Sequence, residues 1–484
     1  MAVPQLRLRR LGSSPVRSGG AYVLYWMTAA RRTEWNYALD HALDWCRELD
    51  VPLVVLEPLR VAYPHACDRF HRFVIDGMAD QAASFAAAGV TYLPYVEPTA
   101  GAGRGLLLRL ASRACVVVAD DYPTFFLPRM LQSAADQLDV ALDAVDANGI
   151  VPMRRPDKEH VTARGYRRWM QGIINEELAR APERAPLSKA PSGTPGLPDL
   201  SAWPMRSEDE LRAPASWIGE LPIDHTVSWT EERGGAAAGH ARWAHFLDSD
   251  LDRYATDSNH PDKHATSEIS PYLHFGHVAA HALFFDLAAH EGWSPGDQSK
   301  PNGKNAGYWN MRPGAEGFLE QLLVWRELAF ATCAIRPDHA DWSVLPEWAR
   351  RTLTEHADDP RDPCYDLATL ERAETYDDLW NAAQRQLVET GRIHNYLRML
   401  WGKKILEWSP SPQVALEWMI LLNDRYALDG RDPNSYSGIT WVLGHFDRGW
   451  GPKRPIYGSI RYMTSGSAKR KLRLKGYLAR WSPS

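Results

Sequence analysis

Residues Ala21–Leu56 read AYVLYWMTAARRTEWNYALDHALDWCRELDVPLVVL, and this stretch indicates the fold of the N-terminal part of the chain. Two short apolar runs, Ala21–Trp26 and Val51–Leu56, flank the amphipathic segment Trp35–Leu49. That order is typical of a strand, a helix and a second strand. Four later segments repeat the pattern, one helix-like and three strand-like: Asp68–Ala88, Val90–Tyr95, Ala114–Ala119 and Val140–Val145. Because strands that alternate with helices form parallel sheets, we expect residues 1–150 to form a Rossmann-like α/β domain with a parallel sheet.

The glycines of this part do not form a dinucleotide-binding motif. No GxGxxG follows the first predicted strand, and Gly101, Gly103 and Gly105 come after the third strand with the wrong spacing. A domain of this kind can still hold a small ligand at the carboxyl ends of its strands. The alternative is a scaffold with an empty cleft.

The rest of the chain divides into a connector and a helical part. Residues 181–204 contain six prolines, a density that prevents helices and central strands. We therefore expect residues 151–236 to connect two domains. Residues 237–484 are expected to form an all-α domain, because apolar residues recur there at helical spacing. The segments with this spacing are Gly239–Tyr254, Tyr272–His290, Glu316–Ala334, Thr369–Glu389, His394–Trp408 and Pro412–Asn423.

The charge of the chain is unevenly distributed. The 484 residues are 45% apolar and 24% charged, which suits two globular domains, and the net charge is −5. The segment from Arg448 to the C-terminus nevertheless carries ten Lys or Arg residues and no Asp or Glu. Such a segment favours an anionic partner, such as a phosphate backbone or a membrane surface, and the alternative is a solvated basic tail.

The pattern of cysteines and the hydropathy of the chain indicate the cellular compartment of the protein. The five cysteines form no CxxC pair, so we expect neither a disulfide framework nor a metal site. The chain has no apolar run of about 18 residues, and its start lacks the apolar stretch of a secretory signal. We expect a soluble, monomeric protein of the cytoplasm, associated with the nucleoid if the source is bacterial, with no membrane attachment.

Two segments of the helical part carry polar groups suited to a ligand. Thr266–Gly276, TSEISPYLHFG, places hydroxyls before a helix start, where free N–H groups can cradle a diphosphate or the hydroxyls can simply cap the helix. Asn423–Asn434, NDRYALDGRDPN, follows a strongly apolar helix. Asn423 and Asp429 are therefore expected near the interior, where a flavin ring would supply polar partners. Surface turns are the alternative for this segment.

A third segment, residues 392–408, is rich in aromatic side chains and reads RIHNYLRMLWGKKILEW. Trp401 and Trp408 are seven residues apart and share a stripe of the predicted helix, and Trp380 on the preceding helix could stack nearby. Such a stripe indicates either core packing or electron transfer. A second face of the helix, which turns polar toward its end, carries Tyr396, Met399 and Lys403.

Together, these segments resemble class II cyclobutane pyrimidine dimer photolyases of the photolyase/cryptochrome family, over essentially the whole chain. The resemblance rests on Tyr25-Trp26-Met27 with Arg31-Arg32 and Asn36, Ser270–Gly276, Lys403–Trp408, Asp429–Asn434 and Ile460–Met463. It implies an antenna-type α/β domain and an all-helical domain that binds FAD. It also implies deoxyribodipyrimidine photo-lyase activity, a carbon–carbon lyase reaction in which photoexcited reduced FAD gives an electron to a flipped-out dimer in UV-damaged DNA. The N-terminal cleft resembles sites for an antenna chromophore of the 8-hydroxy-deazaflavin type.

The resemblance implies roles for individual residues. Those matching flavin contacts are Tyr254, Thr266, Ser267, Ile269, Ser270, Arg398, Asn423, Asp429 and Gly430, with Asn423 facing the flavin N5 and Arg398 paired with Asp429. The family's tryptophans that relay electrons to the flavin match Trp380, Trp401 and Trp408 of this chain. The residues expected at the lesion are Trp325, Tyr396, Met399, Trp441 and Asn259. The candidates for DNA phosphate contacts are Arg461, Lys469, Arg470, Lys471 and Arg473.

The chain departs from the family pattern at the expected substrate pocket. Gln321 occupies the catalytic position of a glutamate that faces the dimer, and glutamine can donate hydrogen bonds but cannot hold a negative charge. The neighbouring Glu320 is expected to point about 100° away on a helix. Ser258 aligns with a lesion-contacting arginine, and the stretch Val442–Phe446 is one residue shorter. Two alternatives therefore stand beside dimer repair: a cryptochrome-like blue-light sensor, and a photolyase-like flavoprotein with altered or weakened lesion specificity.

Overall fold

The chain is divided between two units in alternating segments. The computed structural model describes residues 3–482. The first unit comprises the residues up to Asp157, Ile173–Ala244 and Glu268–His290. The second comprises Lys158–Gly172, His245–Ser267 and the residues from Glu291 onward. The sequential division at residues 150 and 236 stays a prediction.

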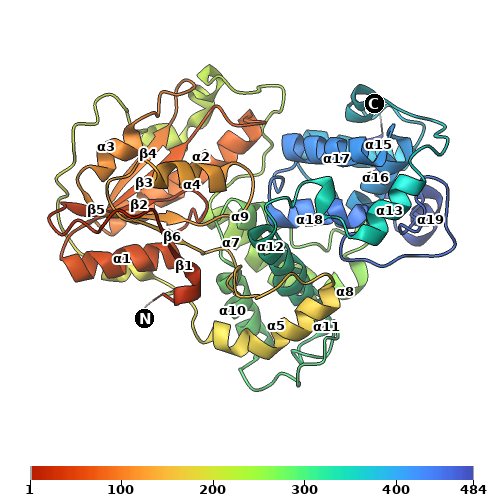
Figure 1. The fold of residues 1–484 in the computed structure, drawn as a ribbon, viewed down its shortest axis with the longest axis horizontal. Coiled ribbons are helices and arrows are strands. Elements are labelled where there is room, and N and C mark those ends of the chain that lie inside the picture. Colours follow the sequence, from red (N-terminus) through yellow and green to blue (C-terminus); the bar gives the residue numbers. More distant parts are fainter. Residues whose placement is uncertain (1–2, 483–484) are drawn as a thin grey trace. The chain divides into compact units, whose positions relative to one another are not determined.

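A six-stranded sheet lies at the centre of the first unit, as Figure 1 shows. The strands are β1 Leu8–Leu11, β2 Tyr22–Trp26, β3 Leu53–Leu59, β4 Thr91–Val96, β5 Ala114–Asp120 and β6 Leu142–Val145, in the order β1-β6-β5-β2-β3-β4. Strands β2 to β6 are parallel, which confirms the expected α/β fold. The sequence did not predict β1, which pairs antiparallel with β6, because its four residues, LRRL, lack an apolar run.

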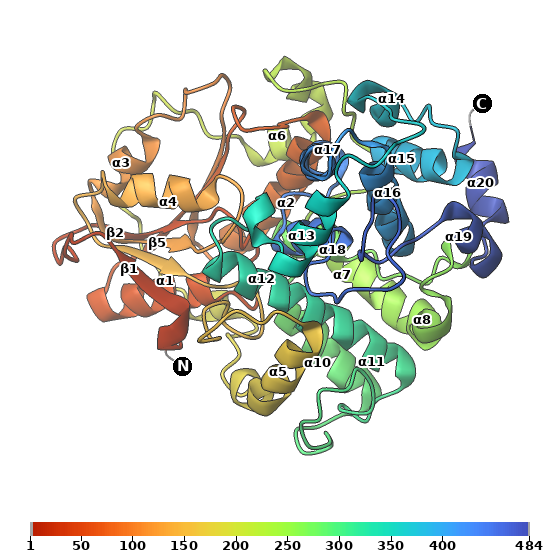
Figure 2. The same cartoon turned by 45° about the vertical axis from the view of Figure 1, so that its right-hand side comes forward.

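Helices cover both faces of this sheet. On one face, Val23 and Tyr25 of β2 pack with α1 (Tyr37–Leu49). The alternate residues of β2 face the core that contains α3 (Leu106–Ala111) and α4 (Leu127–Ala135). All five residues of β2 are buried, as expected for a strand covered on both sides. Figures 1 and 2 show α1 on one side of the sheet and α3 and α4 on the other.

The first unit contains further helices, of which α7 and α10 each end one residue into the second unit. They are α2 Asp68–Ala87, α6 Glu208–Arg212, α7 Ala236–His245, α9 Ser270–His274 and α10 Ala280–Glu291. Within residues 181–204, all of which the structure describes, the one regular element is a 3-10 turn at Pro186–Lys189. The high proline content of that segment accounts for its lack of longer helices and strands.

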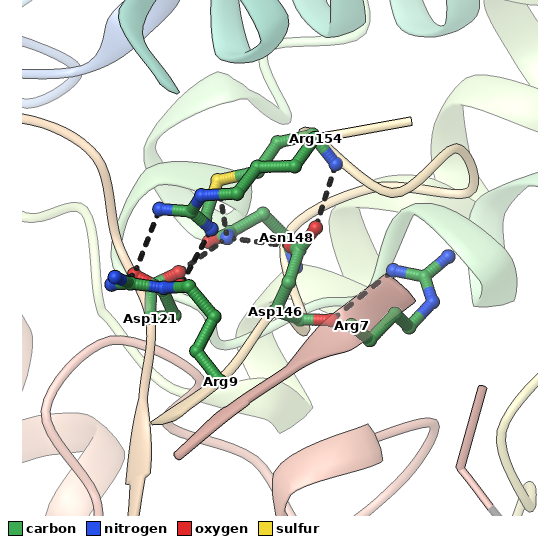
Figure 3. Close-up of polar contacts among 7 residues, drawn as sticks. Arg7, Arg9, Asp121, Asp146, Asn148 and Arg154 are labelled. Atoms are coloured by element: carbon green, nitrogen blue, oxygen red, sulfur yellow. Dashed lines mark hydrogen bonds and ion pairs between the residues drawn. The ribbon is translucent and has the colours of Figure 1, made fainter. Parts of the chain in front are cut away.

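Ionic contacts hold the edge strand β1 in place. Arg9 of β1 donates to both carboxylate oxygens of Asp121 at 2.8 and 3.0 Å, and Arg154 donates to the same carboxylate at 2.6 Å (Figure 3). Asn148 donates to the Asp121 carbonyl at 2.7 Å. Just before β1, the buried Arg7 donates to the Asp146 carbonyl at 3.1 Å. The arginines of this basic N-terminal segment are thus bound to the sheet.

We expect Asp121→Ala to lower the free energy of unfolding by about 1–2 kcal/mol, because two guanidinium groups lose their shared acceptor. Thermal melts and amide exchange at Leu8–Leu11 would measure the effect. Asp139→Ala is the matched control, since Asp139 pairs with Arg17 at 3.0 Å but its side chain is 79% exposed. Equal melting temperatures for the two variants would contradict this account of the strand edge.

The second unit is helical. Its helices are α8 Leu251–Asp257, α11 Pro313–Leu319, α12 Arg326–Ile335, α13 Glu347–Glu355, α14 Leu367–Glu371, α15 Asp378–Thr390, α16 Asn395–Trp408, α17 Pro412–Tyr426, α18 Pro433–Val442, α19 Ser465–Lys471 and α20 Lys475–Trp481. Helix α5 (Ala163–Leu178) contains residues of both units. Helices α15, α16 and α17 lie side by side in Figures 1 and 2. Across residues 3–482, the structure contains no helix with both the length and the apolar character needed to cross a membrane.

Two of the predicted helices are interrupted. The expected helix Tyr272–His290 ends at His274 and restarts at Ala280, because Gly276 takes a φ of +75°. The expected helix Thr369–Glu389 is broken between Glu371 and Asp378. There Asp377 caps α15 by accepting from the backbone N–H groups of Leu379 and Trp380, at 3.2 and 3.1 Å. The cap fixes where the helix that carries Trp380 begins.

Candidate functional site

Three tryptophans form a buried line in the second unit. Trp380 on α15 donates from its indole nitrogen to the Trp401 carbonyl of α16 at 3.0 Å. Its ring meets that of Trp408 edge to face, with centroids 5.5 Å apart. Trp401 in turn donates to Gln384 Oε1 at 2.8 Å. All three side chains are at most 2% exposed, so the structure brings the three tryptophans of the sequence prediction together.

Tyrosines extend this line toward solvent. Trp408 is only 1% exposed, but the rings of Tyr365 and Tyr376 meet it edge to face at centroid distances of 5.5 and 5.6 Å. Tyr376 is 63% exposed. The sequence analysis missed both tyrosines because no motif marks them, and the loop between α14 and α15 that positions Tyr376 was not predicted.

Asn423 presents a buried amide with a defined orientation. Its Nδ2 donates to Ser435 Oγ at 2.7 Å and to Asp424 Oδ1 at 3.3 Å, and the residue is 2% exposed. Both contacts place the NH2 group of the amide toward Ser435 and Asp424. Within residues 3–482, the hydrogen bonds of the Asn423 side chain are both made by Nδ2. Its Oδ1 is left as an acceptor for a ligand N–H group.

The segment after Asn423 folds tightly around Asp424. Arg431 has a φ of +63°, and its backbone N–H donates to Asp424 Oδ1 at 2.9 Å. Tyr436 donates to Asp424 Oδ2 at 2.9 Å, and burial together with this carboxylate raises the pKa of Tyr436. A Cβ atom on Gly430 would lie 2.7 Å from the Asn423 carbonyl oxygen, so only glycine fits there. The segment is thus a rigid support rather than a surface turn.

An ion pair lies one helical turn from Trp401. Arg398 precedes Trp401 by three residues on α16, and its guanidinium is 2.9 Å from Asp429 Oδ1. The two side chains are 18% and 20% exposed. Residues three apart on a helix share a face, so the Arg398–Asp429 pair and the inner end of the tryptophan line are neighbours.

The residues matched to the flavin phosphates and ribityl chain fall in both units. Tyr254, Thr266 and Ser267 belong to the second unit, whereas Ile269 and Ser270 belong to the first. Burial raises the pKa of Tyr254 to about 12, and its ring packs against Phe246 at a centroid distance of 5.5 Å. Ser270 is the first residue of α9, where the sequence predicted a helix start.

The position of the expected catalytic glutamate holds an exposed glutamine. Gln321 and Trp325 lie in a π-helical turn, Glu320–Trp325, between α11 and α12. Glu320 does not replace the missing carboxylate, because it accepts from Arg167 Nε at 2.8 Å in a bidentate ion pair. Ser258 is the C-cap of α8, and Asn259 beside it is exposed.

Cations lie against the aromatic residues expected at the lesion. Arg461 lies over the ring of Trp441 at 5.8 Å, and Lys471 lies over Tyr396 at 4.9 Å. Met399 is partly exposed on the same helix as Tyr396. The other basic candidates, Lys469, Arg470 and Arg473, are exposed, and Lys469 pairs with Asp378. The sequence indicated the aromatic and the basic residues as two separate sets of candidates, but it did not predict that the cations lie against the rings.

The fold is shared with solved structures of one class of protein. The structure is similar to a class III photolyase from Agrobacterium tumefaciens, with a TM-score of 0.67 and 16% identity over 96% of this chain and 86% of that one. It is also similar to a Synechocystis cryptochrome, with a TM-score of 0.63 and 14% identity over 95% of this chain and 88% of that one. The fold is therefore that of photolyases and cryptochromes.

Sequence relatives narrow the assignment, although no protein-family model matches the chain. The chain is 34% identical over 477 residues to the deoxyribodipyrimidine photo-lyase of Methanothermobacter thermautotrophicus, covering 98% of this chain and 97% of that protein. It is 34% identical over 478 residues to the enzyme of the same name from Oryza sativa subsp. japonica, covering 95% and 87%. The chain belongs to the deoxyribodipyrimidine photo-lyase family.

Proposed function

We propose that this protein uses light to split cyclobutane pyrimidine dimers in DNA, with FAD bound by its helical unit. The observation that carries the proposal is the line of Trp401, Trp380 and Trp408, which begins one helical turn from the Arg398–Asp429 pair. Aromatic side chains in contact give an electron a path between a buried redox group and the surface. Family membership supports light-dependent DNA repair in general, and the class II assignment stays a prediction.

The residues of the second unit fit a flavin. The Oδ1 of Asn423 offers an acceptor to a ring N–H group, and the Arg398–Asp429 pair would lie beside the ring. Tyr254, Thr266, Ser267 and Gly430 would contact the rest of the cofactor, and the same role stays predicted for Ile269 and Ser270. When bound and excited by light, FAD supplies the electron chemistry, whereas the protein positions the partners and excludes water.

The lesion would lie against partly exposed aromatic side chains. Trp325, Tyr396, Met399, Trp441 and Asn259 are the candidates for contact with a flipped-out dimer, and indole and phenol rings stack on unpaired bases. The basic candidates Arg461, Lys469, Arg470, Lys471 and Arg473 would contact phosphates. Because Arg461 and Lys471 already lie over Trp441 and Tyr396, phosphate contacts and the lesion site would adjoin.

The direct test is to illuminate the purified, reduced protein with an oligonucleotide that contains one dimer. We expect loss of dimers under blue light, no loss in the dark, and no change in undamaged DNA. Unchanged dimers beside normal photoreduction of the flavin would refute dimer repair and support the light-sensor alternative. Gln321 and the ion-paired Glu320 favour that second candidate, since no carboxylate occupies the expected catalytic position.

Restoring a carboxylate at position 321 should raise the yield. We expect Gln321→Glu to increase dimer repair per absorbed photon by about 3- to 30-fold, because a charged acceptor makes stronger hydrogen bonds than an amide. Gln413→Glu, at an exposed position of α17, is the control and should change nothing. Quantum yields measured side by side would decide, and equal yields for both variants would remove Gln321 from the site.

An antenna chromophore is proposed for the first unit. The carboxyl ends of parallel strands are the usual place for a ligand in such sheets. On β3, the buried Glu57 lies 3.2 Å from Arg31, and burial raises the Glu57 pKa to about 7. A chromophore of the 8-hydroxy-deazaflavin type would add its own band to the absorption spectrum of the native protein, and a spectrum of flavin alone would contradict this assignment.

A further inference from the structure

Lys403 is a buried amine without an ion-pair partner. It lies on α16, is 1% exposed, and is within ion-pair distance of no carboxylate of residues 3–482. Its Nζ donates to the backbone carbonyl of Val442. The same nitrogen lies 5.4 Å from the centroid of the Trp441 ring. The hydrogen bond and the ring contact of the amine are therefore both at the end of α18.

Placing this amine in the interior is costly. Burial lowers the pKa of Lys403 to about 7, while Asp447 raises it and Arg461 lowers it further. The Tyr457 hydroxyl also lies at this residue, and its single proton is shared between the Lys403 carbonyl at 2.8 Å and Glu407 at 3.0 Å. Packing alone would be served better by an apolar side chain, because a buried charge without a counter-ion destabilises the fold.

The end of α18 that carries Trp441 packs closely against α16. A Cβ atom on the adjacent Gly402 would lie 2.7 Å from a methyl group of Val442, so α16 and the end of α18 are in close contact. Arg461 lies over Trp441 at 5.8 Å and over Trp450 at 4.3 Å. Trp441 is therefore held by two cations, one buried and one partly exposed.

We propose that Lys403 is a positioning residue that holds Trp441 as a wall of the lesion site. The inference deepens the proposed function and rests on it, because Trp441 serves as a wall only if a dimer enters. The ammonium group attracts the face of the indole ring and hydrogen-bonds the next carbonyl, so it orders the ring before the lesion arrives. The buried amine strengthens binding of the lesion and lowers the stability of the fold.

The adjacent Lys404 provides a matched control. It lies on the same helix but pairs with Glu407 at 2.8 Å, and its Nζ is 5.2 Å from the ring of Trp408 instead. Lys404→Met removes a lysine of the same helix without touching Trp441. It should leave the affinity for the dimer unchanged.

The test compares Lys403→Met with the wild type and Lys404→Met, all loaded with FAD. The quantity measured is the ratio of Kd values for one oligonucleotide with and without a dimer. We expect Lys403→Met to lose about ten-fold of the preference for the dimer, with flavin content and photoreduction unchanged. In the wild type and in Lys404→Met, but not in Lys403→Met, the preference should weaken as pH rises through about 7, because the Lys403 amine has a pKa of about 7 and then loses its charge. The pH profile keeps the inference testable if the variant does not fold.

The possible outcomes distinguish the proposed function from the proposed role of Lys403. A wild type that binds damaged and undamaged DNA equally would overturn both the proposed function and the role of Lys403. A wild type that prefers the dimer, together with a Lys403→Met variant that keeps the full preference, would overturn the role of Lys403 alone. A pH-independent preference in the wild type would do the same.

Discussion

Replacing Trp380 with phenylalanine is expected to slow photoreduction of the bound flavin by more than about ten-fold, because phenylalanine does not replace the redox chemistry of indole. Trp380 touches both other tryptophans: its indole nitrogen bonds to the Trp401 carbonyl, and its ring lies 5.5 Å from that of Trp408. Removing it breaks the line at its middle. The rise of reduced flavin under blue light, with an added electron donor, measures the effect.

The control for this experiment is Trp217→Phe. Trp217 is a buried tryptophan of the first unit, 7% exposed, whose indole nitrogen donates to the Glu210 carbonyl at 2.9 Å. The substitution removes the same kind of side chain and should leave photoreduction unchanged. If Trp380→Phe reduces its flavin as fast as Trp217→Phe, the three tryptophans are packing residues and the relay does not exist.

A methyl group on Gly276 should strongly destabilise the first unit. Gly276 has a φ of +75°, and an added Cβ would overlap the Ala29 carbonyl oxygen. That part of the chain is rigid, because Asp120 accepts from the backbone N–H groups of Thr28 and Ala29, each at 2.7 Å. We expect Gly276→Ala to lower the free energy of unfolding by at least about 3 kcal/mol, since backbone strain and overlap add. Chemical denaturation monitored by circular dichroism would measure it.

Gly89→Ala, also in the first unit, measures the cost of the backbone conformation without the steric overlap. Gly89 also has a left-handed φ, +67°, but no atom lies within 4 Å of its added Cβ. This variant should lose only about 1 kcal/mol, the cost of the backbone conformation. If the two variants unfold at the same denaturant concentration, the contact between Gly276 and Ala29 contributes nothing.

The helices and strands that could be predicted from the sequence are those marked by a local pattern of apolar residues. Buried β-branched runs such as Ala114–Ala119 were recognisable, because a strand covered on both sides is apolar along its length, and the structure extends this strand by one residue, to Asp120. The strand Leu8–Leu11 was not, since its pairing depends on Arg9 and the distant Asp121. The break at Gly276 was missed for the same reason: the apolar spacing continues across it, while the conformation is set by contact with Ala29.

For the candidate site too, the sequence indicated which residues to consider but not the contacts between them. Asn423, Asp429 and the tryptophans could be named from motifs, and the apolar helix before Asn423 correctly indicated its burial. The contacts that orient these residues could not be named. Ser435 lies twelve positions after the amide that it holds, and Tyr376 meets Trp408 from the loop between α14 and α15.

The central claim is that the helical unit holds a flavin that the tryptophans can reduce. The most direct measurement is the absorption spectrum of the protein expressed with ample riboflavin, before and after blue light with an electron donor. We predict one FAD per protein chain, with oxidised absorption bands that bleach on illumination. A colourless protein that gains no flavin absorbance when FAD is added would contradict it.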